Sequence, residues 1–166
     1  MLERPSQMWK TLPADRRLAA AEAFWRDDQD DSRLQHVEAV VAIAKRLKFR
    51  PKSVQALPID RRARQLAQIS DVSDAIATRA LIAYHFTEKR DLMGAFLDAL
   101  GIAHDRGLID QDDVAPPDRD KLLAAANAVR AAFPKDDVDL YLRTLATLDG
   151  DTWAGLNSVL ERLRGV

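Results

Sequence analysis

The sequence predicts an all-α fold, and three observations support this prediction. Apolar residues return at steps of three and four, and no segment alternates apolar with polar residues over the length of a strand. Alanine is frequent whereas the chain holds only 6 glycines and 2 tyrosines, a composition that favours helix over strand. Proline and glycine divide the chain into segments of helical length. We expect about eight helices.

Start and stop signals place four helices in the first half of the chain. Proline in a first turn begins a helix over residues 13–25, and Ser32 caps a second helix that ends before Pro51. The apolar residues expected to face the core from the second helix are Val37, Val40, Val41, Ala44 and Leu47. A third helix covers residues 58–69 and a fourth runs from about 71 to 86. The fourth is the most apolar and is expected at the centre of the fold.

Four more helices are expected in the second half. Thr87 caps a fifth helix that extends through residue 102, with His104 as a cap in its last turn and Gly107 as its left-handed end. An acidic stretch follows. The sixth, seventh and eighth helices are expected over residues 117–132, 136–148 and 151–163, each bounded by proline, glycine or a capping aspartate.

The length of 166 residues matches one domain, so we predict a single all-helical domain over residues 1–166. A weak subdivision is conceivable only at the acidic loop, residues 110–116. Two similar helix starts, Leu-Pro-Ala-Asp-Arg-Arg at Leu12 and Leu-Pro-Ile-Asp-Arg-Arg at Leu57, lie 45 residues apart. This spacing is typical of helical-hairpin repeats of the HEAT class, although proline followed by aspartate is also simply a common way to begin a helix.

Charge is distributed unevenly along the chain. The formal net charge of −1 argues against a general binder of nucleic acid or anionic membranes. Residues 45–64, however, hold eight basic residues and one acidic residue. A surface for phosphates or nucleic acid is one interpretation of the cluster, and a solvated face, or one paired with the chain's own acidic loops, is the other. The residues assigned to this surface are Lys45, Lys48, Arg61, Arg62 and Arg64.

Known catalytic signatures do not occur in the sequence. It has no phosphate-binding glycine loop, no Gly-x-Ser-x-Gly turn and no His-Glu-x-x-His motif. It also has no cysteine and only three histidines, and we expect neither a metal site nor a cofactor. Enzymatic activity is therefore not favoured.

A polar stripe on the fourth helix is the one candidate site for a small ligand. Asp74, Thr78 and His85 fall within about 40° of one another around the helix axis, whereas Arg79, the fourth residue assigned to this candidate site, lies off the stripe. One interpretation makes His85 a proton carrier oriented by a carboxylate, because an unperturbed imidazole titrates near neutrality. The other makes the stripe the more polar edge of a structural helix.

These observations favour a non-catalytic interaction or scaffold module whose partner is a protein, a second copy of this chain included. The alternatives are a regulatory protein that binds nucleic acid through residues 45–64 and an enzyme or small-ligand binder with a pocket near Asp74, Arg79 and His85. The start of the chain has no apolar run of signal-peptide length, and no stretch is apolar enough to span a membrane. We therefore expect a cytoplasmic protein of bacterial type without membrane contact.

Overall fold

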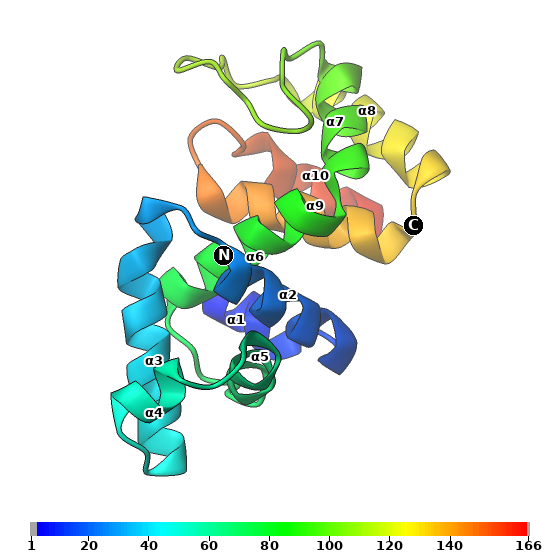
Figure 1. The fold of residues 1–166 in the computed structure, drawn as a ribbon. Coiled ribbons are helices and arrows are strands. Elements are labelled where there is room, and N and C mark those ends of the chain that lie inside the picture. The colour runs from blue at the N-terminus through cyan, green and yellow to red at the C-terminus, as the bar shows by residue number, and fades with distance from the viewer. Residues whose placement is uncertain (1–2, 166) are drawn as a thin grey trace. The chain divides into compact units, whose positions relative to one another are not determined.

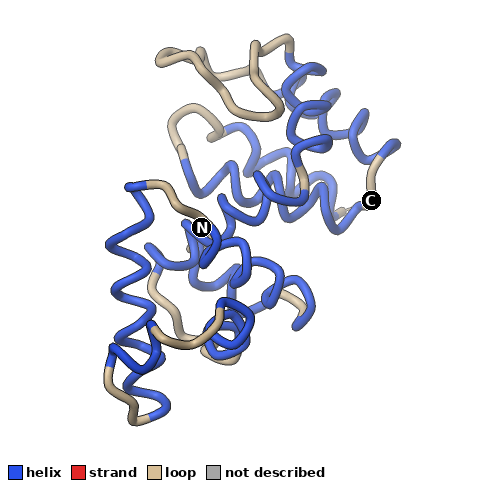
Figure 2. The backbone as a smooth tube through the Cα atoms, in the orientation of Figure 1, coloured by secondary structure: helices blue, strands red, loops and turns tan. Residues whose placement is uncertain are grey.

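The protein is all-helical, as the sequence predicted. A computed structural model describes residues 3–165, and within this range there are ten α-helices, one short 3-10 helix and no strand (Figures 1 and 2). An isolated bridge between Asp105 and Leu108 is the only β-type pairing among these residues. That the helices pack as hairpins of the HEAT type stays a prediction.

The chain divides into two compact units. Residues 4–87 form the N-terminal unit, and residues 88–165 together with Glu3 form the C-terminal unit. The division falls in the last turn of the helix Asp74–Glu88. The acidic loop at 110–116, where the sequence indicated a weak subdivision, lies inside the C-terminal unit. That residues 1–166 behave as one domain stays a prediction.

Six α-helices begin in the N-terminal unit. They are α1 (Pro5–Thr11), α2 (Ala14–Arg26), α3 (Arg33–Leu47), α4 (Pro51–Gln55), α5 (Ile59–Ala67) and α6 (Asp74–Glu88), with the 3-10 turn η1 (Asp30–Ser32) before α3. The most extensive packing joins α2 to α5, and α3 contacts η1, α4 and α5. Seven of the fifteen residues of α6 are buried, and its place at the centre of the fold stays a prediction.

Helix α1 was not expected from the sequence. Pro5 occupies its first position, and the Gln7 side chain accepts a hydrogen bond of 3.0 Å from the Arg4 backbone N–H. Met8 and Trp9 are fully buried, and the Trp9 indole N–H donates to the Ile69 carbonyl over 2.8 Å. Seven residues carry too little periodicity to predict a helix, so these tertiary contacts stabilise α1.

Helix α3 buries a different face from the one predicted. Val40 and Ala44 are buried as expected, together with Ala39 and Ile43, but Val37 and Val41 are exposed. The sequence offers two apolar stripes on this helix, and only the one that faces the rest of the N-terminal unit can be covered. The helix ends where Lys48 adopts a left-handed conformation, with φ of 56°.

Four helices form most of the C-terminal unit: α7 (Arg90–Leu100), α8 (Arg119–Ala132), α9 (Lys135–Leu148) and α10 (Gly155–Arg164). α8 contacts α7, α9 and α10, and α9 also contacts α10. Within their core, the ring of Phe96 meets the edge of Tyr141 at a centroid distance of 5.7 Å. Asp118 caps α8 by accepting the Lys121 N–H.

The prediction that the fifth helix continues through residue 102 and ends at Gly107 is wrong. α7 ends at Leu100 because Gly101 takes the left-handed conformation, with φ of 71°, and the Ile102 N–H bonds back to the Leu97 carbonyl. Gly107, with φ of 89°, instead belongs to the turn closed by hydrogen bonds between Asp105 and Leu108. Both glycines can end a helix, and the first one along the chain does so.

Candidate interaction surface

The outer side of α3 carries three neighbouring aliphatic side chains in contact with solvent. Leu34, Val37 and Val41 are 73%, 56% and 42% exposed. Steps of three and four residues place them within about 60° around the helix axis, so they form one continuous stripe. The buried residues Ala39 and Ile43 lie on the opposite side of α3, and the buried residues Val40 and Ala44 border the stripe. This stripe is a helix face that no other described element covers.

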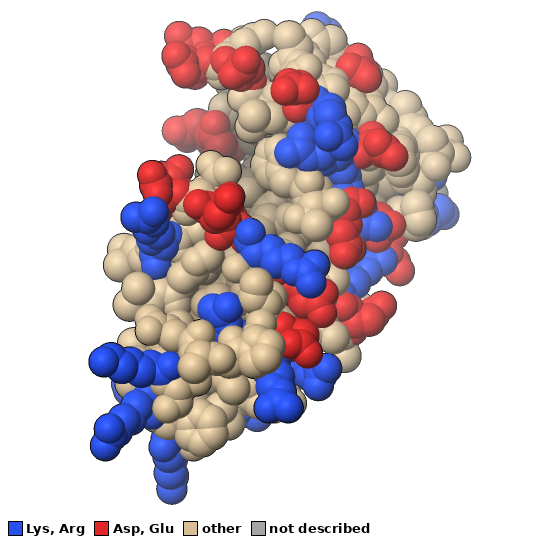
Figure 3. Space-filling view, in the orientation of Figure 1, with Lys and Arg blue, Asp and Glu red and all other residues tan. Residues whose placement is uncertain are grey.

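Basic residues continue the same stripe toward the end of α3. Lys45 and Lys48 follow Val41 at steps of four and three, and both are exposed. Neither has an ion-pair partner within residues 3–165. Phe49, Arg50 and Lys52 are also exposed, and blue side chains gather in Figure 3 where α3 ends and α4 begins. We define the α3 face as Leu34, Val37, Val41, Lys45 and Lys48.

The segment before α3 is acidic. Four aspartates, Asp27, Asp28, Asp30 and Asp31, lie there between Arg26 and Arg33, and Arg33 pairs with Asp30 at 3.1 Å. Asp27 is engaged internally, because its carboxylate accepts hydrogen bonds from the Ser32 hydroxyl and the Gln29 N–H. Lys45 and Arg46 in the last turn of α3 complement the helix dipole. The aspartates before α3 and the bases at its end give the two ends of this helix opposite charges.

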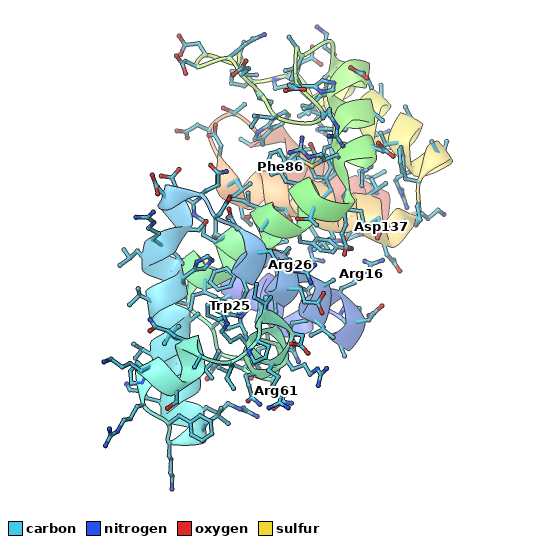
Figure 4. All side chains as sticks on the ribbon, viewed as in Figure 1. Arg16, Trp25, Arg26, Arg61, Phe86 and Asp137 are labelled. Atoms are coloured by element: carbon cyan, nitrogen blue, oxygen red, sulfur yellow. The ribbon has the colours of Figure 1, made fainter. Side chains whose placement is uncertain are left out.

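The five basic residues predicted to bind phosphate differ in their contacts and exposure. Arg62 lies over the indole of Trp25, with its guanidinium carbon 4.9 Å from the ring centroid, and Arg64 pairs with Asp60 at 3.4 Å. Lys45, Lys48 and Arg61 remain exposed and have no carboxylate partner in the described part of the chain. Figure 4 shows Trp25 inside the N-terminal unit and Arg61 extending outward from α5.

Asp74, predicted to bind a ligand, joins α1 to α6. Its carboxylate accepts hydrogen bonds of 3.0 Å from the Ser6 backbone N–H and of 3.0 Å from the Arg4 guanidinium Nε. Ser6 is in the first turn of α1, where backbone N–H groups lack helical partners, and Asp74 is also in the first turn of α6. The hydrogen bonds from Ser6 and then Arg4 lower the pKa of Asp74 from 3.8 to about 2.

The structure does not bring Asp74 and His85 together. Eleven residues of helix separate them by about 16 Å along the axis, although both lie on the same side. His85 is 2% exposed, and its Nδ1 donates to the Leu81 carbonyl at 2.8 Å, because a carbonyl oxygen can only accept. Thr78 and Arg79 lie between them and are half-buried. The four predicted residues therefore do not form a single binding site.

One polar cluster of the C-terminal unit was not identified from the sequence. Arg143 donates to Glu3 over 2.8 Å and to Asp139 over 3.2 Å, and the hydrogen bond to Glu3 is the main reason that its pKa is raised. Glu3 and Arg143 are 140 residues apart, so no local pattern could reveal them. Glu3 and Arg143 line a hollow together with Thr147, Asn157 and Glu161. None of the predicted site residues lines it.

His104 lies beyond the end of α7 and does not cap that helix as expected. Its Nδ1 accepts the Gly107 backbone N–H at 3.0 Å, which leaves Nε2 to donate to Asp98 at 2.7 Å. The imidazole therefore holds the turn after α7 against the helix. Gly94 leaves room for the ring, because a Cβ added there would lie 3.1 Å from the His104 Cε1.

Within residues 3–165, no three histidine or acidic side chains are grouped so that they could hold a metal ion. Among the helices of the same residues, none combines the length and the apolar character needed to cross a bilayer. The cytoplasmic location stays a prediction.

No family model, no curated protein and no solved structure matches this chain. The function of the protein must therefore be inferred from the geometry of the chain itself.

Proposed function

We propose that the protein is a non-catalytic interaction module that binds a protein through the α3 face. The observation that supports this proposal is the stripe of Leu34, Val37 and Val41, exposed side by side on one helix. Single exposed apolar residues are normal on protein surfaces, and Leu108 and Leu148 are examples in the C-terminal unit. A contiguous apolar stripe beside charged residues is typical of a binding surface instead.

The spacing of the stripe suits recognition by another helix or by a groove. Partners of an amphipathic helix contact residues at i, i+3 and i+7, which is the spacing of Leu34, Val37 and Val41. Burying these side chains removes apolar area from water, which is the main favourable term in most protein association. Lys45 and Lys48 have no internal partners and would supply the charged border that sets orientation.

The use of Asp74 as a tie between α1 and α6 supports the non-catalytic part of the proposal. A carboxylate whose pKa is lowered to about 2 by fixed hydrogen bonds is a poor proton acceptor near neutrality. An enzyme or small-ligand binder with a pocket near Asp74, Arg79 and His85 stays a prediction that no observation in the structure favours.

The proposal can be tested by photo-crosslinking in the cells that naturally make the protein. A photoreactive amino acid replaces Val37 in one variant and Leu148, which is equally apolar and 40% exposed, in a control variant. We expect a discrete protein adduct from position 37, absent from position 148 and lost when Val41→Asp is added. The same adducts from both positions, or none from position 37, would contradict the proposal.

A regulatory protein that binds nucleic acid is the second candidate, because Lys45, Lys48 and Arg61 have no carboxylate partner within residues 3–165. Three phosphate contacts would reduce the affinity for a DNA duplex about forty-fold between 50 and 200 mM salt. Fluorescence anisotropy with labelled DNA and RNA measures this dependence. Arg61→Glu with Arg64→Glu should abolish binding, whereas Arg119→Glu with Arg162→Glu, which changes the net charge equally, should not. Absent or salt-insensitive binding would eliminate this candidate.

A further inference from the structure

We infer that the occupant of the α3 face is a second copy of this chain, with the two α3 helices packed antiparallel about a two-fold axis near Val37. The inference rests on the proposed function and specifies its partner. Antiparallel pairing follows from the order of side chains over residues 27–48, which is acidic before α3, apolar in the first half of α3 and basic at its end.

The apolar residues are placed symmetrically enough to meet one another. With the axis near Val37, this residue faces Val37 of the second copy. Leu34 lies three residues before Val37 and Val41 four residues after it, so Leu34 of each copy meets Val41 of the other. Every exposed aliphatic side chain of the stripe is then covered by an aliphatic side chain, as an isologous contact requires.

The charges agree with the same register. Lys45 lies eight residues after Val37, about 12 Å along the axis, and Asp30 and Asp31 precede Val37 by seven and six residues. Antiparallel pairing therefore brings Lys45 of each copy toward Asp31 of the other, whereas Asp30 already pairs with Arg33 of its own chain. The symmetry makes each contact twice. Parallel pairing would put acid against acid and base against base, which costs binding energy.

Two other occupants fit only part of the surface. An anionic membrane would attract Lys45 and Lys48 but repel the four aspartates before the same helix and the exposed Glu38. An acidic peptide would match the basic end alone. A second copy matches both ends and the apolar middle.

The contact should be weak. α3 has 15 residues, about 22 Å of helix, and presents three aliphatic side chains. One such face lies at the lower end of specific interfaces, below about 1,200 Å² of total buried area. We expect a dissociation constant on the order of 100 µM, so self-association should depend on concentration.

Sedimentation velocity on the full-length protein from 5 µM to 1 mM tests the inference. We expect conversion from monomer to dimer, and a dimer at least ten-fold weaker in Val37→Asp, which sets two carboxylates against each other at the axis. Lys45→Asp and Asp31→Lys should each weaken the dimer, and an equimolar mixture of these two variants should regain it. Circular dichroism should show unchanged folding, because all three positions are exposed. A protein that stays monomeric at 1 mM would overturn the inference.

Introduced cysteines test the antiparallel register, because the chain has none of its own. Val37→Cys should crosslink to itself with a short thiol reagent. Lys45→Cys should not, since the two Lys45 positions lie about 24 Å apart in this register, but it should crosslink when mixed with Asp31→Cys. Leu148→Cys serves as the control for random collision. Efficient crosslinking of Lys45→Cys alone would indicate parallel pairing and overturn the inference.

The failure of this inference can be distinguished from the failure of the proposed function. A monomeric protein whose Val37 photoprobe captures a different protein would refute self-association and leave the interaction module in place. A probe at Val37 that captures no protein in cells would refute the proposed function itself. An adduct with twice the mass of the chain would support both.

Discussion

The tie between α1 and α6 through Asp74 allows a prediction of how stability depends on pH. Because the folded-state pKa of Asp74 is lowered from 3.8 to about 2, the ionised carboxylate stabilises the folded state. This stabilisation is fully present above about pH 4 and is lost as the pH falls toward 2. Asp74→Asn removes the charge while keeping an oxygen that can accept the Ser6 N–H.

The magnitude follows from the shift and the exposure of the group. A lowering from 3.8 to about 2 would correspond to about 2.4 kcal/mol in a shielded site. The Asp74 side chain is 36% exposed, so solvent screening reduces this contribution, and we expect about 1 kcal/mol. For a chain of this length, that loss lowers the melting temperature by about 2–4 °C.

Urea unfolding followed by circular dichroism measures the effect. At pH 7 the Asp74→Asn variant should be less stable than the wild type by about 1 kcal/mol. The difference should shrink between pH 4 and pH 2 as Asp74 of the wild type becomes protonated. Asp71→Asn, at an exposed position without an ion-pair partner in residues 3–165, should show no such difference. A difference in unfolding free energy between wild type and Asp74→Asn that is absent at pH 7, or that persists unchanged at pH 2, would refute the reasoning.

Three further predictions concern stability and are checked by the same unfolding assay. Ile43→Ala should cost about 2–4 kcal/mol because it leaves a cavity, whereas Val41→Ala, on the exposed side of α3, should cost less than about 1 kcal/mol. Trp9→Phe should cost about 1–3 kcal/mol because the Ile69 carbonyl loses its donor. Gly107→Ala should cost more than Gly101→Ala, since a Cβ at residue 107 would lie 2.7 Å from the Met93 Cβ and nothing lies within 4 Å of one at residue 101. Equal costs within the first or third comparison, or an unchanged Trp9→Phe variant, would contradict the corresponding argument.

Periodicity and local stop signals were sufficient to predict the longer helices. α3, α8 and α9 lie close to their expected ranges, because proline and capping residues act over a few residues and leave a visible pattern. Two kinds of error followed from the same reliance on local signals. α1 was missed because it depends on Trp9 bonding to Ile69, 60 residues away. The end of α7 was placed too late because two glycines compete for one role.

The candidate site was predictable only in part, for a similar reason. The sequence identified the basic residues between the end of α3 and α5 but did not show that Arg62 lies over Trp25 or that Arg64 pairs with Asp60. It grouped Asp74 with His85 by angle around α6, although the rise of the helix separates them by about 16 Å. Helical angle identifies residues on one side, whereas a site also requires proximity along the axis and partners from other elements.

The error on Val37 and Val41 is the most informative of these differences. A helix with two apolar stripes can bury only the one that its own unit covers, and α3 buries Ile43 and Val40. The second stripe adds no hydrophobic stabilisation to the isolated chain, since its apolar area is hydrated in the folded as in the unfolded state. A partner that covers it removes this area from water, and the acidic segment before α3 and the basic end of α3 restrict the partner's orientation. The proposed interaction therefore depends on Val37 and Val41, the two residues that the sequence wrongly assigned to the core.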